Sequence, residues 1–575
     1  MNISREIEKA VEQVFRDIGL VGPAMIKQAA KPEFGHYQVN GVMGAAKKSG
    51  RNPRELAAEI INQLELGAAD TLEVAGPGFI NIHLSSRYLA SALKLMCESD
   101  RLAVDQMSEQ KILVDYSSPN LAKEMHVGHL RPTTIGDCLV RMLEFLGHEV
   151  IRANHVGDWG AQFGSLLAYM DQLSEADATR RLEMELRDLE KFYQAASRLF
   201  KTDEVFAVKA REYVVRLQSG DEKCLKLWKQ FIDESITHCQ AVYDAFNVSL
   251  TREDVKPESF YNDDLPLMVQ DLTDQGLAVE SEGATCVFLD EFIGKDDKPL
   301  PAMIKKSDGG YPYLATDLSA VRYRAGTLKV DKAYYVVGAE QQLHLRQLFA
   351  VSHAAGYINP EQTFQHFPHG KVLKKDGTPF KTRDGADVKL ADVIQEAKDR
   401  ALSLVSEKNP ELDETVRKEV ADKVGTGALK FAELSKNRMT DYIFDWDTML
   451  SFEGNTAPYL QYAYTRIRSI FRKEAIDPKA IRSGIKLNEP REIALGVKLL
   501  QFQECLETAV VDCHPNLLCN YLYELAGLFM VFYEHCPVLK AETETRNSRL
   551  MLCDLVARTI KQGLGLLGIE TVEQM

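Results

Sequence analysis

Two histidines in the segment His126-Val127-Gly128-His129 are the first candidates for chemistry in this chain. Two imidazoles at that spacing can donate hydrogen bonds to one anion, and a helix start would add unpaired backbone N–H groups and a partial positive charge. Because Gly128 has no side chain, a flat base could lie against the backbone there. The segment favours a nucleotide triphosphate site. The alternative is a pair of ordinary surface histidines at a helix start.

The flanking sequence predicts a β-α-β unit that would position these histidines. Lys111 to Tyr116 and Glu149 to Ala153 are short runs of strand character, and Leu130 to Leu146 has apolar residues at helical spacing. The carboxyl ends of parallel strands meet at one edge of a sheet, where open α/β sheets bind ligands. The two polar strand exits, Ser117 to Gly128 and Asn154 to Gly160, are therefore expected to lie close together.

Length, charge and cysteine content restrict the class of protein. A chain of 575 residues is too long for one core, and suggests about three or four domains. The 69 basic and 84 acidic residues give a net charge of −15, so a nucleic-acid partner would need local basic surfaces. The ten cysteines form no CxxC pair, and we expect them to be reduced, with no zinc site. The charged amino-terminal segment and the lack of a long apolar run predict a cytoplasmic protein without membrane contact.

The segments Ser118 to Arg131 and His155 to Gly160 together resemble the signature of class I aminoacyl-tRNA synthetases, in the form of the arginyl-tRNA synthetases. The resemblance is specific there and extends more weakly to both termini. It implies a multidomain α/β protein whose Rossmann-type parallel-sheet catalytic domain carries the HxGH signature. The expected domains are an N-terminal tRNA-contacting α+β domain (1–107), the catalytic domain (108–385, with a helical insertion at about 171–262), a helical connecting region (386–450) and an all-helical anticodon-binding domain (451–575).

The activity implied by the resemblance is that of an ATP-dependent arginine–tRNA ligase. Arginine would be activated with ATP to arginyl-adenylate and then passed to the 3′-terminal ribose of its tRNA. The implied partners are the tRNA for arginine, L-arginine, and ATP with Mg²⁺ as a substrate; we expect no tightly bound cofactor, and a monomer. Two alternatives remain open: another class I synthetase or nucleotidyltransferase with the same HxGH motif, and a non-catalytic tRNA-binding paralogue.

The resemblance also implies roles for particular residues. The ATP site would comprise the signature histidines and glycine with two residues of the second strand exit: His126, Gly128, His129, Gly157 and Asp158. The arginine site would comprise Asp115, Asn120, His155, Tyr313, Asp317 and Gln341. Carboxylates such as Asp115 and Asp317 can match the planar donor fork of a guanidinium, and the ammonium of lysine does not have this fork.

Two further segments would deliver the later members of this set. The run from Pro301 to Leu318 predicts a strand, an Asp-Gly-Gly turn and a second strand that carries Tyr313 and Asp317. The run Tyr334 to Val337 predicts a strand whose exit carries Gln341 and His344. Gln341 would face the substrate, whereas His344 is assigned no role beyond the start of a helix.

A basic loop from His366 to Leu390 stands where class I synthetases usually carry KMSKS. Phe380-Lys381-Thr382-Arg383 occupies that place here, so Lys381 and Arg383 are the candidates for contact with ATP and the departing pyrophosphate. Family members without an intact KMSKS resemble this chain in having a lysine at the position of Lys123. We therefore expect Lys123 to supply the missing cation. The alternative is that the loop and this lysine are simply solvated.

The resemblance places tRNA contacts in both terminal domains. Phe79 would stack on a base of the D-loop and Asn81 would hydrogen-bond there. Tyr459, Tyr462 and Arg466 are candidates for anticodon binding. Without the resemblance, Phe79 would be interpreted as a strand residue of the core, and a single arginine as part of a solvated face.

Overall fold

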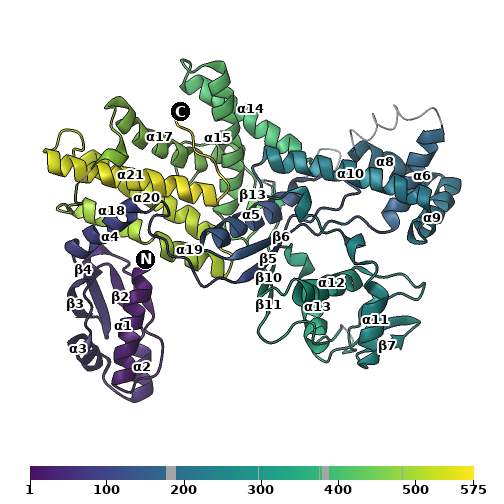
Figure 1. Ribbon diagram of the computed structural model, residues 1–575, viewed down its shortest axis with the longest axis horizontal. Helices are drawn as coiled ribbons and strands as arrows, with labels where there is room; N and C mark the ends of the chain where they lie inside the picture. Colours follow the sequence, from purple (N-terminus) through teal and green to yellow (C-terminus); the bar gives the residue numbers. More distant parts are fainter. Residues whose placement is uncertain (176–188, 295–296, 375, 379–387, 482) are drawn as a thin grey trace. The chain divides into compact units, whose positions relative to one another are not determined.

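The computed structural model describes residues 1–175, 189–294, 297–374, 376–378, 388–481 and 483–575 (Figure 1). The chain forms two compact units. Unit 1 contains Met1–Met107, Leu450–Leu566 and Glu570–Met575, and unit 2 contains Ser108–Met449 and Leu567–Ile569. No helix among the described residues combines the length and apolar character that crossing a membrane requires.

The amino-terminal part of unit 1 is an antiparallel sheet, in the order β1-β2-β4-β3, with helices packed against it. The Asn52 side chain accepts from the backbone N–H groups of Arg54 and Glu55, and so caps the helix that begins at Pro53. The turn Gly76-Pro77-Gly78 joins β3 to β4. The elements are α1 (Ile3–Asp17), β1 (Ile26–Gln28), η1 (Pro32–Phe34), β2 (Tyr37–Val39), α2 (Val42–Ser49), α3 (Pro53–Gln63), β3 (Ala69–Ala75), β4 (Phe79–Leu84) and α4 (Ser86–Glu98).

The remainder of unit 1 is helical, as predicted for the carboxyl-terminal region. Its helices pack on one another, α17 against α21 and α20 against α18 and α19, and α4 lies against α18 (Figure 1). Glu504 on α19 is buried and accepts hydrogen bonds from the Tyr37 hydroxyl (2.7 Å) and the Ser4 backbone N–H (2.8 Å). The elements are α17 (Ala457–Lys473), η7 (Pro478–Ala480), α18 (Pro490–Leu500), α19 (Phe502–Val511), α20 (Pro515–His535) and α21 (Thr543–Leu566).

Unit 2 is built on a parallel sheet of four strands in the order β11-β10-β5-β6. The predicted β-α-β unit is present as β5 (Lys111–Asp115), α5 (Leu130–Phe145) and β6 (Glu149–Ala153), with the short helix η2 (Val127–His129) before α5. The chain leaves β5 to one side toward β6, and later returns on the other side through β10 (Lys332–Tyr335) and β11 (Thr363–His366). Asp115 ends β5 and is paired in register with Tyr335 of β10. This switch in strand order is where open α/β sheets bind ligands.

The prediction of a hairpin after Pro301 is wrong for the second strand. β9 (Ala302–Lys305) is a strand, but the chain beyond the turn forms helix α12 (Tyr313–Arg322) and the helical turn η5 (Tyr323–Thr327). Leu314, Leu318 and Val321 are buried at helical spacing, and this pattern overrides the strand character of the short run before them. Tyr313 and Asp317 therefore lie about one helical turn apart.

Helices make up most of the rest of unit 2. α6 (Ala161–Glu175) leads into the insertion, which contains α8 (Leu189–Thr202), α9 (Glu204–Gln218), α10 (Glu222–Ala245), η3 (Arg252–Asp254) and η4 (Glu258–Tyr261). α11 (Leu265–Asp274) precedes β7 (Ala278–Ser281) and β8 (Ala284–Val287), which form an antiparallel sheet with β9. The later elements are η6 (Ala339–Gln341), α13 (Gln342–Ala354), β12 (Val372–Leu373), α14 (Leu390–Lys408), α15 (Glu414–Leu434), β13 (Tyr442–Ile443) and α16 (Trp446–Met449).

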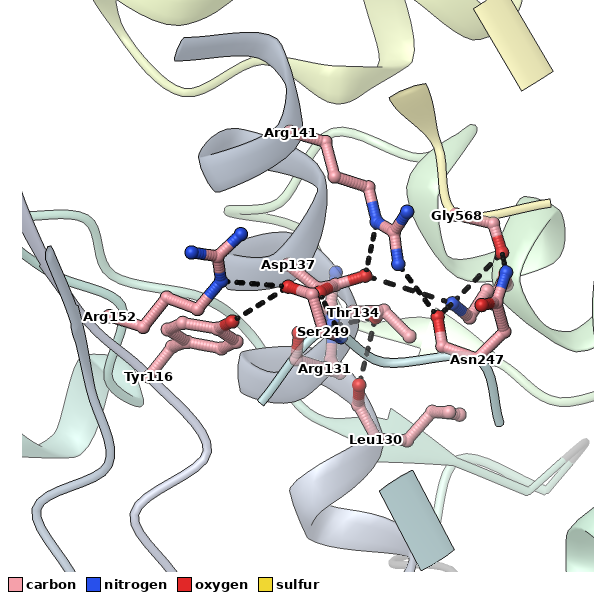
Figure 2. A network of polar contacts seen from close by, with 11 residues as sticks. Tyr116, Leu130, Arg131, Thr134, Asp137, Arg141, Arg152, Asn247, Ser249 and Gly568 are labelled. Carbon is pink, nitrogen blue, oxygen red and sulfur yellow. Dashed lines mark hydrogen bonds and ion pairs between the residues drawn. The ribbon is translucent and has the colours of Figure 1, made fainter. Parts of the chain in front are cut away.

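A buried polar network centred on Asp137 of α5 joins segments of unit 2 that are distant in sequence (Figure 2). One oxygen of Asp137 accepts from the backbone N–H (2.7 Å) and hydroxyl (2.5 Å) of Ser249, and the other accepts from Arg141 Nε (2.8 Å). Burial raises the pKa of Asp137, but Lys430 and Arg141 outweigh burial and hold the pKa below its usual range. The Asp137 carboxylate is therefore charged in the folded protein at neutral pH.

Lys430 of α15 extends this network to the carboxyl-terminal turn. Its buried ammonium lies 3.9 Å from Asp137 and donates to the carbonyl oxygens of Asn247 (2.7 Å) and Gly568 (3.0 Å). A Cβ added to Gly568, whose φ is +69°, would lie 2.5 Å from the Lys430 ammonium. The turn thus requires glycine both for its backbone conformation and for the close approach of this lysine.

We expect Lys430→Met to lower the free energy of unfolding by about 3 kcal/mol, because it removes one partner of a buried charge. Tryptophan fluorescence during urea unfolding suits this measurement, since the three tryptophans, Trp159, Trp228 and Trp446, all belong to unit 2. Lys418→Met is the control, because Lys418 is on the same helix but pairs with Glu414 in solvent. Equal shifts in the unfolding midpoint for the two variants would contradict a special role for the buried ammonium.

Candidate active site

The two polar strand exits lie side by side, as expected. The Leu121 N–H donates to the Gly157 carbonyl (2.9 Å), and the Gly157 N–H donates to the Pro119 carbonyl (3.1 Å). These bonds continue the pairing of β5 with β6 beyond the ends of the strands. The loop that leads to the histidines is thereby fixed against the second exit.

The β5 exit has a strained backbone at Ser117 and Ser118, whose φ angles are +69° and +44°. Such left-handed conformations cost a non-glycine residue about 1 to 3 kcal/mol, and persist only where the surroundings enforce them. Here the Ser118 N–H donates to Asn154 Oδ1 (3.0 Å), and the Ser118 hydroxyl donates to Asp115 Oδ1 (2.9 Å). The strain therefore turns the chain so that Ser118 holds the carboxylate at the end of β5.

The two signature histidines cap the start of the η2–α5 helix. Gly128 N–H donates to His126 Nδ1 (3.0 Å), and His126 N–H donates to His129 Nδ1 (3.1 Å). A ring nitrogen that accepts a hydrogen bond carries no proton, so we assign the proton of each neutral ring to Nε2. Both imidazoles are then N–H donors at the expected anion site, but the backbone N–H groups of Val127, Gly128 and His129 are already paired within the protein, contrary to the expectation of unpaired groups there.

His129 is neutral at physiological pH. Burial and the neighbouring His126 imidazole lower its pKa to about 3. The two ring centroids are 4.2 Å apart, so a charge on His129 would be repelled by any charge on His126. His129 can therefore contribute a hydrogen bond to a phosphate, but not a formal positive charge.

Gly128 has a second reason to be glycine besides leaving room for a base. A Cβ at this position would lie 2.7 Å from Cε1 and 2.8 Å from Nδ1 of the His126 ring. Real Cβ contacts are not that short, so a larger residue would push the imidazole away from the N–H that orients it. The glycine therefore sets the position of His126.

The Asp115 carboxylate already forms an ion pair with an arginine of the protein itself. Arg324, in η5, places Nη2 2.7 Å from Asp115 Oδ2 and has only 2% of its surface exposed. The Arg324 guanidinium also lies 5.1 Å from the centroid of the Tyr335 ring. Sequence reasoning missed Arg324. Arg324 lies seven residues after Asp317, a spacing that places both residues on one face of a helix. The sequence predicted a strand at Asp317, so this relation was missed.

Asp317 lies between two histidines. Its Oδ1 is 3.3 Å from His155 Nε2, and its Oδ2 is 2.6 Å from His344 Nε2. Burial would raise the pKa of Asp317, but its bonds to His155 and His344 hold that pKa well below the usual range. The structure thus brings together the predicted His155 and Asp317, and adds His344, which sequence analysis left without a role.

The other predicted site residues differ in their contacts. Asp158 is fully buried and accepts from the Ser259 N–H (2.9 Å) and hydroxyl (2.5 Å), which ties the second exit to the insertion. Asn120 is exposed, and its Oδ1 accepts from the Ala122 N–H (2.9 Å). Tyr313 and Gln341 have exposed side chains.

Lys123 contacts the helical insertion. Its ammonium lies 4.8 Å from the centroid of the Tyr193 ring on α8, a cation–π contact that the sequence did not indicate. The predicted loop cations Lys381 and Arg383 lie outside the described residues. Among the described residues, no group of three or more His, Cys, Asp or Glu side chains could hold a metal ion.

The residues predicted to contact tRNA lie in unit 1. Phe79 is half-buried at the start of β4, and Asn81 is buried, with its Oδ1 accepting from Gln38 Nε2 (2.8 Å). Tyr459 is half-buried on α17, against the ring of Tyr523. Tyr462 and Arg466 are exposed on the same helix. The roles of these residues stay predictions.

Comparisons with known proteins agree along the whole chain. The family described as tRNA synthetases class I (R), catalytic domain, matches residues 92–446, the DALR anticodon binding domain matches 460–575, and the arginyl tRNA synthetase N terminal domain matches 1–84. Arginine–tRNA ligase of Hahella chejuensis is 53% identical over 579 residues, covering 100% of both chains. That of Cellvibrio japonicus is 55% identical over 557 residues, covering 96% of each.

A solved structure shows the same fold. The crystal structure of arginyl-tRNA synthetase from Plasmodium falciparum has a TM-score of 0.86 and 28% identity, and the match covers 100% of this chain and 99% of that one. The family and the multidomain α/β fold class predicted from the sequence are therefore confirmed. The chain belongs to the class I arginyl-tRNA synthetase family.

Proposed function

We propose that this protein is an arginine–tRNA ligase that activates arginine with ATP and transfers it to the 3′-terminal ribose of its tRNA. The observation that carries the proposal is the arrangement at the β5 exit. One loop leads from Asp115, which with Asp317 acts electrostatically on His155, directly to the histidine pair at the start of α5. The two carboxylates suit a guanidinium, and the histidine pair suits a triphosphate.

In the first step, a carboxylate oxygen of arginine attacks the α-phosphorus of ATP, and the bond to the bridging oxygen breaks as pyrophosphate leaves. No covalent enzyme intermediate is needed, because positioning and charge neutralisation can catalyse an in-line displacement. The Nε2–H groups of His126 and His129 would donate to phosphate oxygens, and Gly128, Gly157 and Asp158 would border the nucleotide. Mg²⁺ would enter with ATP as part of the substrate. We expect no zinc and no resident cofactor.

Asp317 is the acceptor for the substrate guanidinium in this proposal. A charge-assisted pair with a carboxylate is stronger than a neutral hydrogen bond, and the planar fork of arginine distinguishes it from lysine. Asp115 would complete the pocket through Arg324 and Ser118, which hold it in place. Tyr313, Gln341 and His155 would border the side chain, and Asn120 the amino-acid head group.

In the second step, a terminal ribose hydroxyl of the tRNA attacks the carbonyl carbon of the adenylate, and AMP leaves. The net charge of −15 means that tRNA would be held through local contacts. Phe79 and Asn81 would contribute such contacts in the amino-terminal domain, and Tyr459, Tyr462 and Arg466 in the helical domain. We place the protein in the cytoplasm as a monomer.

The test of this function is ATP–pyrophosphate exchange with each amino acid in turn, in the presence of tRNA. Exchange that depends on arginine alone supports the proposal. Exchange with a different amino acid would indicate another class I specificity. No ATP consumption with any amino acid and cognate tRNA would favour a tRNA-binding protein without catalytic activity.

We expect Asp317→Asn to raise the KM for arginine by at least about tenfold, because it removes a charge-assisted partner of the guanidinium. The KM for ATP should stay within about twofold, since the phosphate site is a separate group of residues. Asp274→Asn, at an exposed position on α11, is the matched control. Steady-state kinetics with each substrate varied decides the matter, and equal losses for arginine and ATP would count against the pocket.

We expect Lys123→Ala to slow adenylate formation by at least about 100-fold, because its cation would neutralise the departing pyrophosphate. Transfer from preformed arginyl-adenylate should change far less, since no pyrophosphate leaves in that step. Lys123→Arg keeps the charge and should restore much of the activation rate. Single-turnover measurements of the two steps provide the check. Unchanged activation, or equal damage to both steps, would show that the lysine is merely solvated.

We expect Gly128→Ala to weaken ATP binding by about tenfold, because the added Cβ would displace the His126 ring and with it a phosphate donor. Gly527→Ala is the control, since a Cβ there would meet nothing within 4 Å. Equilibrium binding of ATP to the two variants measures the effect. Normal ATP affinity in Gly128→Ala would mean that His126 does not hold the nucleotide.

A further inference from the structure

Both oxygens of the Asp317 carboxylate are already occupied by side chains of the protein. His155, at the exit of β6, contacts Oδ1, and His344, on α13, contacts Oδ2. The exposed fractions of these side chains are 13% for His155, 24% for Asp317 and 29% for His344. A small ligand can therefore reach the carboxylate, but it meets two imidazoles there.

The contacts of the two ring nitrogens of His155 favour its positively charged form. Its Nδ1 lies 3.1 Å from the carbonyl oxygen of Lys256, and a carbonyl oxygen can only accept. Its Nε2 faces Asp317, and an ionised carboxylate also only accepts. With a proton on each ring nitrogen, both contacts become hydrogen bonds, so this arrangement favours the imidazolium form of His155.

The pKa values shift in the same direction. Burial lowers the pKa of His155 and of His344, but the bond and the charge of Asp317 outweigh burial and raise both above the usual value for histidine. Both shifts favour the charged form of these imidazoles.

We propose that His155 and His344 are protonated beside Asp317 when arginine is absent. Binding of the arginine guanidinium then releases these protons into solvent. This inference rests on the proposed function, because it takes arginine as the ligand of Asp317. It makes the two histidines residues that set arginine affinity, without a part in the chemical step.

The driving force is competition between cations for one carboxylate. The guanidinium keeps its proton at any physiological pH, whereas an imidazolium can lose its proton. A like charge brought within a few ångströms disfavours the protonated ring. Asp317 can also accept at more than two sites, so a neutral imidazole and the guanidinium can share it. The protons, and not the side chains, are what must leave.

Other charged and titratable groups surround the cluster. Asp115 and Arg324 neutralise each other as an ion pair. The groups that face the histidines and Asp317 from the neighbouring strand, loop and helical turn are Tyr335, Asp158, Tyr261 and Glu258. Burial raises the pKa of Glu258 to about 7. Glu258 is thus a second group that could lose a proton when a cation binds, and it serves as the control below.

The sign of the pH dependence follows from the raised pKa values. Below them the imidazoliums oppose the guanidinium, and above them the rings are neutral and the opposition is gone. The Kd for arginine should therefore fall as pH rises through neutrality, by up to about tenfold per pH unit for each proton released. ATP does not contact Asp317 in the proposed site, so the Kd for ATP should not show the pH dependence that comes from these histidines.

Calorimetric titration of the full-length protein with L-arginine tests the inference directly. Measured at one pH in buffers of different ionisation enthalpy, the heat gives the number of protons released. We expect a release between about 0.5 and 2 protons at pH 7, and a parallel slope of log Kd against pH. Binding without proton release would overturn the inference and leave the proposed function intact. No arginine binding at any pH, with ATP bound normally, would overturn both.

Three variants identify the source of the protons. The double variant His155→Asn and His344→Asn keeps side-chain N–H donors that carry no charge, and should abolish the release and flatten the pH dependence. Glu258→Gln should retain most of the release and of the pH dependence. Release that survives in the double variant and disappears in Glu258→Gln would overturn the assignment to the histidines. Thermal unfolding and ATP binding check that each variant folds; if the double variant fails, proton counts for each single histidine variant replace it.

Discussion

The buried charge of Asp137 is the constraint on which the arrangement of unit 2 depends. Unpaired, a carboxylate in that environment would cost several kcal/mol, so its partners must be in place before α5 can pack. Those partners come from α5 itself, from the end of the insertion, and from α15. A second buried pair, Arg131 with Glu433 at 2.6 Å, also joins α5 to α15. Two such pairs permit only one relative position of the helices. The position of α5 in turn determines where the histidines at its start lie.

The sheet supplies the second fixed reference for the site. Asp115 is held in register between β6 and β10, and the strained serines after it turn the chain back toward Asn154. Backbone hydrogen bonds hold this loop against the neighbouring exit, and they help to fix the distance from the carboxylate to the histidines. This is preorganisation of the kind that charge stabilisation requires, since donors that must move lose much of their effect.

The sequence was a good guide where a local pattern determines the structure, and a poor one where partners come from afar. The β-α-β unit and the helix start at the histidines follow from periodicity and from the types of residue at the helix ends. α12 was mistaken for a strand because the Asp-Gly-Gly turn is also a hairpin signal, and this error hid Arg324. His344 and Tyr193 gave no local signal, since their importance lies in contacts with Asp317 and Lys123. The domain boundaries and the site assignments stay predictions.

The two carboxylates of the pocket have partners of different chemical kinds, and that difference determines which of them can serve a ligand. Arg324 is buried, pairs with Asp115 and carries a charge that it cannot lose at physiological pH. A second guanidinium at Asp115 would meet this permanent cation. Asp317 is held by imidazoles, whose charge is reversible near neutral pH. In the proposed site, an incoming guanidinium would therefore replace a proton at Asp317, whereas the Asp115–Arg324 pair would keep both of its charges.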